Sequence, residues 1–202
     1  MKITLQTSGS TGKPKYVTHN EENFYKPAKF LAEKWKLNSD DIILNAFPAW
    51  TIAHWAFCFF PAQITNCKVI NINFEPFKFW KQVKEIKPTT MTLAIGTLHT
   101  MLKQGKPDLS FMKNLSTGSA PVTNEQINMM RNTGAEQIWN IYGSTECIPP
   151  VMISHNLKFN FNETPYNLEY KDTLIVDGFD TEDKFVDNQC LGRTNLNKTW
   201  KS

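Results

Sequence analysis

A loop rich in glycine and hydroxyl side chains stands near the start of the chain, and its composition suits a polyphosphate. Its residues are Thr7, Ser8, Gly9, Ser10, Thr11 and Gly12. Lys13 and Lys15 follow, so cations, hydroxyl donors and closely approachable backbone amides fall together. Pro14 stands where a Walker A loop has Ser or Thr after its lysine, so the loop is of another type. The alternative interpretation is a flexible Gly/Ser linker.

A second polar segment, YGSTE at residues 142–146, ends a predicted strand. A third segment, STGSAP at residues 116–121, is predicted to be a polar turn that leads into a helix. Taken alone, YGSTE is equally compatible with an ordinary turn. Its combination with the other two segments favours a nucleotide site.

The elements that position these segments alternate between strands and helices. Short apolar runs predict strands at residues 2–6, 42–47, 68–72, 90–95 and 138–142. Helical spacing predicts helices over 21–36, 47–60 and 98–103, another after Pro76, and one that starts at a capping box at Thr123. This alternation predicts an α/β fold with a mostly parallel layered sheet flanked by helices, which receives ligands at its strand ends.

The helical pattern ends at about Pro150, and short strands such as 173–176 then alternate with polar turns. We therefore expect a small β-rich C-terminal subdomain. The predicted division is an AMP-binding α/β core over residues 1–155 and a small β-rich unit over residues 156–202.

Composition and charge argue against several classes of protein. Twenty-two Lys plus Arg residues are spread along the chain against 19 Asp plus Glu, so little favours a nucleic-acid partner. The four cysteines lack the spacing of a zinc site. No segment resembles a signal peptide or reaches the roughly 20 apolar residues of a membrane span. We expect a soluble cytoplasmic protein with reduced thiols.

The polar segments together resemble the adenylate-forming superfamily, which includes acyl-CoA synthetases, nonribosomal peptide synthetase adenylation domains and luciferases. TSGSTGKPK resembles its phosphate-binding signature, LSFMKNLSTGSAP its loop beside adenine, and NIYGSTE its Tyr-Gly-x-Thr-Glu motif. KPTTMTLAIGTLHTML resembles the strand and helix that line its acyl pocket. The resemblance covers roughly residues 3–150 in the family's order. It implies activation of an acyl or aryl acid as acyl-AMP by ATP, with release of pyrophosphate.

The resemblance also implies roles for individual residues. Tyr142 would stack on the purine, and Asn140 would form a hydrogen bond with the exocyclic amine of the purine. Glu146 would ligate Mg²⁺. Arg193 would reach the ribose, although a solvated surface arginine is an equal alternative. The implied catalytic residues are Thr7, Lys15, Thr145 and Glu146. The implied nucleotide ligands are Thr7, Ser8, Gly9, Ser10, Thr11, Gly12, Lys15, Gly118, Ser119, Ala120, Pro121, Asn140, Tyr142, Gly143, Ser144, Thr145 and Arg193.

The sequence identifies the residues of the acid pocket less clearly than those of the nucleotide site. FPAWTIAHWAFCFF resembles a segment that supplies pocket walls in the family, so the substrate candidates are Trp50, Thr51, His54, Trp55 and Gly96. Each aromatic residue can equally fill the core beneath the sheet, and a lone histidine in an apolar stretch is more often a core residue than a catalyst. The tryptophans, without an acidic residue to bind an amine, favour an acyl or aryl acid over an amino acid.

The sequence departs from the family pattern at both ends. It begins at the phosphate loop and ends near GRTNLNKTWKS, which resembles the family's hinge with Asn195 in place of aspartate. The resemblance therefore implies a minimal form without the N-terminal subdomain and without the C-terminal domain that carries the adenylation lysine. The ribose-binding aspartate of a Thr-Gly-Asp motif has no clear match, so Asp183 and Asp187 are both candidates. Asp177 is expected to be structural.

ATP and Mg²⁺ are the implied cofactors, and a small carboxylic acid is the implied substrate. Coenzyme A would enter only in a thioester step that depends on rotation of the C-terminal domain. A partner chain or self-association is expected to replace that domain. The alternatives are a regulatory remnant that binds ATP or AMP without turnover, and an acyl-binding module. The phosphate loop over 7–15, together with Glu146, favours the enzyme.

Overall fold

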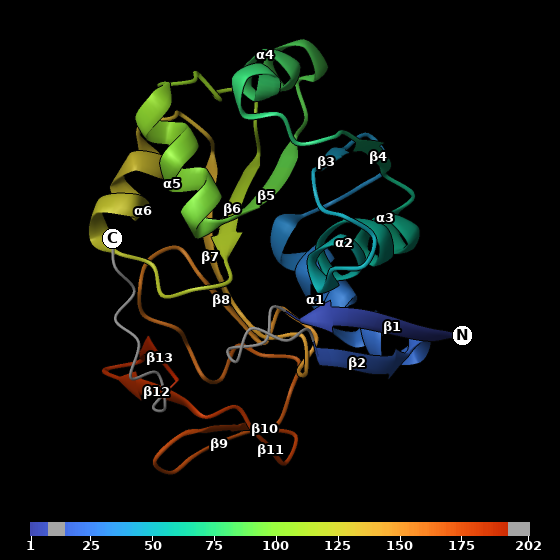
Figure 1. Cartoon of the computed structure of the whole chain (residues 1–202), viewed down its shortest axis with the longest axis vertical. Helices are drawn as coiled ribbons and strands as arrows, with labels where there is room; N and C mark the ends of the chain where they lie inside the picture. The colour runs from blue at the N-terminus through green and yellow to red at the C-terminus, as the bar shows by residue number, and fades with distance from the viewer. Residues whose placement is uncertain (8–14, 194–202) are drawn as a thin grey trace.

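The computed structural model describes residues 1–7 and 15–193, and its centre is a six-stranded sheet (Figure 1). The strand order is β4-β3-β5-β6-β7-β8. All neighbouring strands are parallel except β7 and β8. The predicted α/β fold with a mostly parallel sheet is therefore confirmed. The strands are β3 (Ile42–Asn45), β4 (Lys68–Asn71), β5 (Thr90–Ala94), β6 (Asn114–Gly118), β7 (Gln137–Tyr142) and β8 (Met152–Ser154).

The central strands β5 and β6 are buried along almost their whole length, as parallel strands covered by helices must be. Ser116 and Thr117 are buried in β6, and Thr117 Oγ1 donates to the Leu93 carbonyl of β5 at 2.9 Å. The expected polar turn over 116–121 is therefore wrong for residues 116–118, because these residues pair in register with β5 and β7. The turn follows from Ser119.

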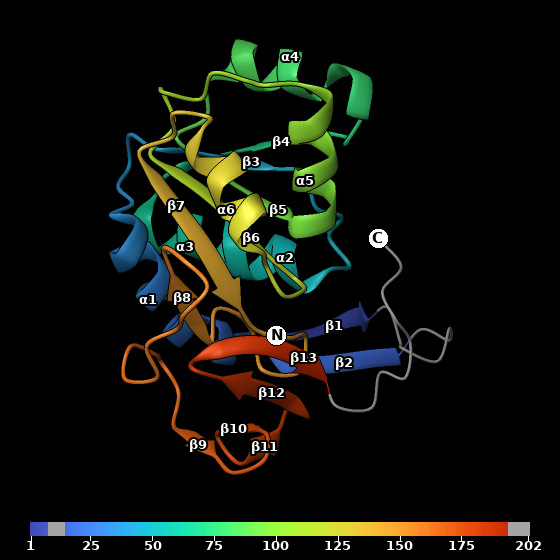
Figure 2. The same cartoon turned by 90° about the vertical axis from the view of Figure 1, so that its left-hand side faces the viewer.

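Helices cover both faces of the sheet (Figures 1 and 2). Each face has its own hydrophobic cluster, one containing Phe24, Trp35 and Phe60 and the other containing Phe79 and Leu98. On the first face lie η1 (Glu21–Phe24), α1 (Tyr25–Trp35), α2 (Ile52–His54), the π-helical turn η2 (Trp55–Phe59) and α3 (Phe60–Thr65). On the second lie α4 (Pro76–Ile86), α5 (Ile95–Gln104) and α6 (Asn124–Arg131).

Local signals set where the helices begin. At α6, Thr123 Oγ1 accepts from the Gln126 amide and the Gln126 side chain accepts from the Thr123 amide, which confirms the predicted capping box. The aromatic helix predicted over 47–60 begins only at Ile52 and passes through the π-helical turn. Pro61 has no amide hydrogen to donate to the preceding turn, and a gap in the helical ladder favours such a local widening.

Two expectations concern membrane spans and disulfides. Within residues 1–7 and 15–193, no helix is long and apolar enough to cross a membrane. Cys58, Cys67, Cys147 and Cys190 are free thiols.

A hairpin and several short strands lie outside the large sheet. The hairpin joins β1 (Lys2–Thr7) antiparallel to β2 (Lys15–Asn20). From residue 151 to 193 the described chain contains strands but no helix, which agrees with a β-rich C-terminal part. The domain boundary at 155/156 stays a prediction. The strands beyond the large sheet are β9 (Leu168–Tyr170), β10 (Leu174–Val176), β11 (Phe179–Asp180), β12 (Asp183–Val186) and β13 (Gln189–Arg193).

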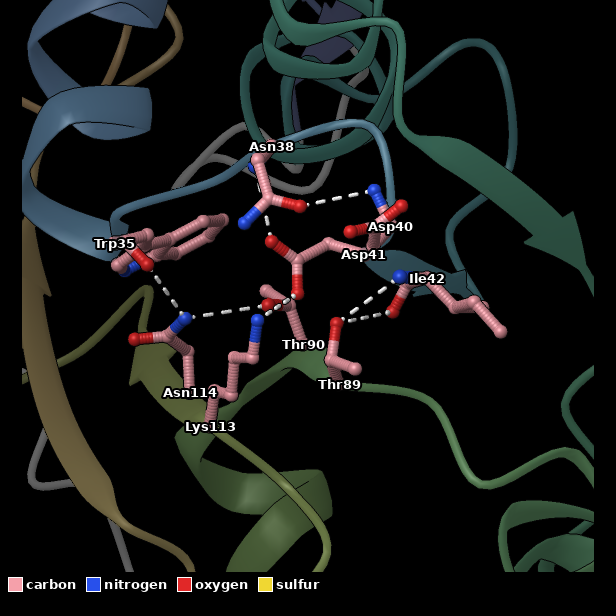
Figure 3. Close-up of polar contacts among 9 residues, drawn as sticks. All are labelled: Trp35, Asn38, Asp40, Asp41, Ile42, Thr89, Thr90, Lys113 and Asn114. Atoms are coloured by element: carbon pink, nitrogen blue, oxygen red, sulfur yellow. Dashed lines mark hydrogen bonds and ion pairs between the residues drawn. The ribbon is translucent and has the colours of Figure 1, made fainter.

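A polar network fixes the amino ends of the central strands (Figure 3). The buried Asp41 carboxylate accepts from Lys113 Nζ at 2.7 Å and from the Asn38 amide at 2.9 Å. Burial alone raises the pKa of Asp41, but these hydrogen bonds outweigh it and hold the pKa below its usual value. Asn114 donates to the Trp35 carbonyl at 3.0 Å, which ties the end of α1 to β6. This network stabilises the edge opposite the predicted ligand loops.

Candidate functional site

The predicted loops lie at the carboxyl ends of the parallel strands, where an α/β sheet receives its ligands. β6 ends at Gly118 and β7 ends at Tyr142, and these two strands pair directly. The β1–β2 hairpin contacts the same edge (Figures 1 and 2). The fold therefore brings together segments that lie far apart in the sequence.

The hairpin frames the predicted phosphate loop. Thr7, the last residue of β1, pairs with Lys15, the first residue of β2. Thr7 is half-buried and Lys15 is exposed. The structure thus places both ends of the loop at the site. The predicted ligands Ser8, Gly9, Ser10, Thr11 and Gly12 lie outside the described residues.

A histidine outside every predicted motif, His19, joins the hairpin to the YGSTE segment. His19 Nε2 lies 2.7 Å from the Thr145 carbonyl oxygen, so the ring donates this hydrogen bond. The same ring meets the buried Phe24 edge-on, with centroids 5.9 Å apart. The alternation of residues along β2 could have indicated His19, because Val17 and His19 share the less exposed face of this strand.

The segment after β6 has the close backbone packing expected of a loop that meets a flat ligand. A Cβ on Gly118 would collide with the Ile141 carbonyl oxygen, so only glycine fits there. Ser119 has a φ of 73°, a left-handed conformation that side chains other than glycine adopt mainly at constrained or functional positions. Ala120 is half-buried and Pro121 is exposed.

Tyr142 is held at the end of β7 by contacts to its hydroxyl and to its ring. The hydroxyl donates to Asp183 Oδ2 at 2.7 Å, and the ring meets Phe185 edge-on with centroids 5.1 Å apart. Burial, and then the Asp183 charge, raise the pKa of the hydroxyl, which keeps it a donor. Asn140 donates its Nδ2 to the Asn156 carbonyl at 3.0 Å. Its Oδ1 is left as the acceptor that an exocyclic amine requires.

Packing constrains the middle of the YGSTE segment. A Cβ on Gly143 would lie 2.5 Å from the Pro149 Cβ, closer than carbon atoms approach. Ser144 Oγ is buried and has no hydrogen-bond partner among the residues that the structure describes. Such a hydroxyl is stabilised when a ligand, water or ion supplies a partner.

The predicted metal ligand and the predicted ribose arginine lie together. Glu146 Oε2 is 3.8 Å from Arg193 Nη2, at the end of β13. Both side chains are partly exposed, so this ion pair is weak and its members can take other partners. Asp183 pairs with Arg193 in the β12–β13 ladder. Burial raises the pKa of Asp183, although the hydrogen bond from Tyr142 and the charge of Arg193 each act to lower it.

The structure separates the two aspartates that the sequence left open. Asp183 is buried against Tyr142, whereas Asp187 is exposed in the turn between β12 and β13. Glu182, just before Asp183, has a φ of 60°, a conformation that favours glycine. Which of the two aspartates binds the ribose stays a prediction.

Most candidates for the acid pocket lie before or within the aromatic helix. Trp50 is 61% exposed, and its carbonyl accepts from the Gln6 amide of β1 at 3.1 Å. Thr51 and Trp55 donate to backbone carbonyls of the loop before α2, so they shape this loop. Gly96 lies in the first turn of α5, and a Cβ there would meet no atom within 4 Å. It therefore faces open space.

His54, the remaining candidate, lines a cavity of about 360 Å³ together with Asn45 and Asn71. Its Nδ1 lies 2.8 Å from Asn45 Nδ2. The structure thus gives His54 a polar environment within an otherwise aromatic segment, which the composition of that segment did not predict.

Comparison with known proteins decides the family. The family model described as AMP-binding enzyme matches residues 4–173. The chain belongs to this family. Among curated members, an olefin beta-lactone synthetase of Stenotrophomonas maltophilia is 23% identical over 161 residues, covering 76% of this chain and 28% of that protein. An acetyl-coenzyme A synthetase of Thiobacillus denitrificans is 28% identical over 134 residues, covering 60% of this chain and 20% of that protein.

Solved structures share the fold of this chain. O-succinylbenzoate coenzyme A synthetase from Bacillus subtilis, in complex with ATP and magnesium ion, has a TM-score of 0.65 at 22% identity, covering 75% of this chain and 32% of that one. An acyl-CoA synthetase (AMP-forming)/AMP-acid ligase II-like protein from Dyadobacter fermentans has a TM-score of 0.75 at 17% identity, covering 95% of this chain and 60% of that one. The chain spans less than a third of the length of the curated relatives above.

Proposed function

We propose that this chain activates a carboxylic acid by ATP-dependent adenylation, giving an acyl adenylate and pyrophosphate. The observation that carries the proposal is the convergence of the hairpin ends, the loop after β6 and the YGSTE segment at one edge of a parallel sheet. Membership of the AMP-binding enzyme family supports it. The acyl or aryl character of the acid, and coenzyme A as a later acceptor, are parts of the same proposal.

In this proposal, ligands from several elements hold the nucleotide. The backbone after Gly118 and the ring of Tyr142 enclose the adenine, and Asn140 Oδ1 accepts from its exocyclic amine. Asp183 and Arg193 bind the ribose. The hydrogen bond from Tyr142 to Asp183 supports this assignment, because it fixes the residue at the base relative to the residue at the sugar. The loop framed by residues 7 and 15 receives the β and γ phosphates.

Magnesium fits the chemistry of this site. Proteins commonly bind Mg²⁺ through one or two carboxylates together with substrate phosphates. Glu146 supplies one such carboxylate, with 27% of its side chain exposed and only a loose ion pair. No group of three or more His, Cys, Asp or Glu residues gathers in the described part of the chain, which suits an ion held largely by the substrate. When bound, the ion would offset charge on the phosphate oxygens.

The side chains contribute positioning and charge compensation, which dominate phosphoryl and adenylyl chemistry of this kind. Lys15 brings positive charge to the phosphates, and the Thr145 hydroxyl contacts the α phosphate. A carboxylate oxygen of the acid attacks the α phosphorus. The new bond from that oxygen to phosphorus forms as the bond from phosphorus to the pyrophosphate oxygen breaks. A partner chain or a second copy of this chain is proposed to supply a further lysine.

Carboxylate-dependent exchange of labelled pyrophosphate into ATP tests the proposal over a panel of fatty, aryl and amino acids. We expect exchange with at least one acid and at least a tenfold loss in Glu146→Ala, because the metal ligand is removed. Glu85→Ala, on the exposed surface of α4, should behave as the unchanged chain does. Exchange per molecule that rises with protein concentration supports a second copy. ATP binding without exchange for any acid contradicts adenylation and favours a regulatory nucleotide-binding role.

A further inference from the structure

A cavity of about 420 Å³ lies at the β8 edge of the large sheet, on the face that α1 covers (Figure 2). This volume suits a small organic molecule. The lining comes from Lys34 of α1, Trp139 of β7, Ile153 of β8 and polar residues of the segment 155–163. None of these residues is a predicted ligand of the nucleotide or of the acid, so the cavity belongs to neither site.

Strand alternation separates this cavity from the proposed adenine site. Trp139 packs in the hydrophobic cluster beneath α1. Successive residues of a strand point to opposite faces of the sheet, so Asn140 and Tyr142 lie on the other face. The two places share one turn, because Asn156 lines the cavity and its backbone carbonyl accepts from Asn140 Nδ2 at 3.0 Å. An occupant of the cavity therefore lies against the turn that orients Asn140 without entering the nucleotide site.

His155 gives the cavity a flat and fixed surface. Its ring lies against the Trp139 indole, with ring centroids 3.9 Å apart and the planes tilted by 37°. His155 Nδ1 donates to the Ile138 carbonyl at 2.9 Å, and Arg131 Nη2 donates to the His155 carbonyl at 3.2 Å. His155 is nevertheless exposed, so the ring face turned away from Trp139 is open to a ligand. Because the ring is already held in place, stacking another ring on it costs little conformational entropy.

The charged and amide groups around the cavity favour an anion. Lys34 Nζ lies 3.1 Å from Glu163 Oε2, so these two charges offset each other. Lys158 has no ion pair within the described part of the chain, and it leaves one net positive charge at the cavity. Asn156 Oδ1 accepts from the Lys158 amide at 2.7 Å, so the group left for a ligand is the donor Nδ2. The Lys158 side chain is exposed, so an anion can pair with it without leaving water completely.

We infer that this cavity binds a small aromatic anion, whose ring stacks on His155 and whose charge pairs with Lys158. The inference is independent of the proposed adenylation, because no proposed ligand of the nucleotide or of the acid takes part. A neutral ring lacks the ion pair, and a small anion without a ring lacks the stacking, so each binds more weakly. A cation meets the net positive charge of the lining and is disfavoured.

Three probes that separate the ring from the charge test the inference. Titrations of the isotope-labelled whole chain, followed by NMR, compare benzenesulfonate with its neutral analogue benzenesulfonamide and with methanesulfonate, which has no ring. The Trp139 indole N–H and the backbone amides of residues 153–158 report binding at this cavity. We expect benzenesulfonate to bind about fivefold more tightly than either of the others, the effect of one exposed ion pair or of one ring contact.

Two variants should move the affinity for benzenesulfonate in opposite directions. Lys158→Gln removes the cation and should lower the affinity to that of benzenesulfonamide. Glu163→Gln releases Lys34 from its ion pair and should raise the affinity by about the same factor, a gain that loss of folding cannot produce. Lys81→Gln, on the exposed surface of α4, should leave the affinity unchanged.

Equal affinities for the three probes overturn the inference, as does the absence of any response from Trp139 and residues 153–158. Unchanged affinity for benzenesulfonate in both Lys158→Gln and Glu163→Gln overturns it as well. The proposed adenylation is judged separately, because it is read from pyrophosphate exchange.

Discussion

The hydrogen bond from His19 to the Thr145 carbonyl links the hairpin that enters the phosphate loop with the segment that holds Glu146. His19→Leu removes the donor and keeps an apolar side chain against Phe24. We expect the affinity for Mg·ATP to fall roughly tenfold, because one hydrogen bond that preorganises two ligand segments is lost. His19→Gln places an N–H near the position of Nε2 and should retain most of the affinity. Isothermal titration calorimetry measures both variants.

Thermal unfolding of the same two variants separates site geometry from general stability. If His19 positions the YGSTE segment, His19→Gln binds Mg·ATP more tightly than His19→Leu does, even when the two variants lose the same amount of thermal stability. Unchanged affinity in His19→Leu, or the same loss in both variants, would show that the hydrogen bond does not position the site.

Gly143 and Gly96 form a matched pair for a test of packing around the site. A Cβ on Gly143 would press on Pro149, so Gly143→Ala should lower the free energy of unfolding by about 1–3 kcal/mol. Gly96 lies in α5 with open space at its Cβ position, so Gly96→Ala should leave stability unchanged or raise it by up to about 1 kcal/mol. Urea unfolding measures both. A similar change in the two variants would contradict the packing argument.

At the scale of elements, the pair of Asp41 and Lys113 joins the residues just before β3 and β6 (Figure 3). Asp41→Asn keeps the size of this buried side chain and removes its charge. We expect the free energy of unfolding near neutral pH to fall by about 1–3 kcal/mol, the range for hydrogen bonds to a charged group. Asp40→Asn, at the exposed neighbour, should change it by less than about 0.5 kcal/mol. Chemical denaturation compares the two variants.

The same pair predicts a dependence on acid pH. The pKa of Asp41 is lower in the folded chain than its ordinary value, so the stabilisation by its carboxylate is complete above the unfolded-state pKa of about 4. It is lost as pH falls through the folded-state pKa. The difference in stability between the unchanged chain and Asp41→Asn should therefore be constant at neutral pH and shrink below about pH 4. Urea unfolding over a pH series measures it, and a difference independent of pH would exclude the charge as its cause.

At the scale of the whole molecule, alternating strands and helices were predictable because most strands are apolar and most helices are amphipathic. Hydrophobicity alone did not predict β6, in which Ser116 and Thr117 are buried in the sheet. The Thr117 hydroxyl bonds to a neighbouring strand, and hydrophobic patterns do not register such a bond. The π-helical turn was not predicted for a related reason, because it lies within a segment that is apolar throughout and has no hydrophobic pattern of its own.

The loops of the candidate site could be predicted from the sequence, but the contacts between these loops could not. His19 with Thr145 and Tyr142 with Asp183 are pairs that lie far apart in the chain, so no local pattern contains them. The choice between Asp183 and Asp187 as the ribose ligand stays a prediction. Ligand identities within the phosphate loop stay predictions.

Mg·ATP should stabilise the whole chain, because its proposed ligands come from the hairpin, the large sheet and the β12–β13 strands. At a ligand concentration one hundred times Kd, binding adds about 2.7 kcal/mol to the free energy of unfolding. For a chain of this size that corresponds to a rise in Tm of roughly 5–10 °C. Glu146→Gln should lose the increase in Tm that depends on Mg²⁺ and keep the increase that ATP alone produces. Arg193→Leu should reduce both increases in Tm. Thermal unfolding with ATP, with and without Mg²⁺, measures these shifts. An equal Mg²⁺-dependent rise in Glu146→Gln and in the unchanged chain would exclude Glu146 as the metal ligand.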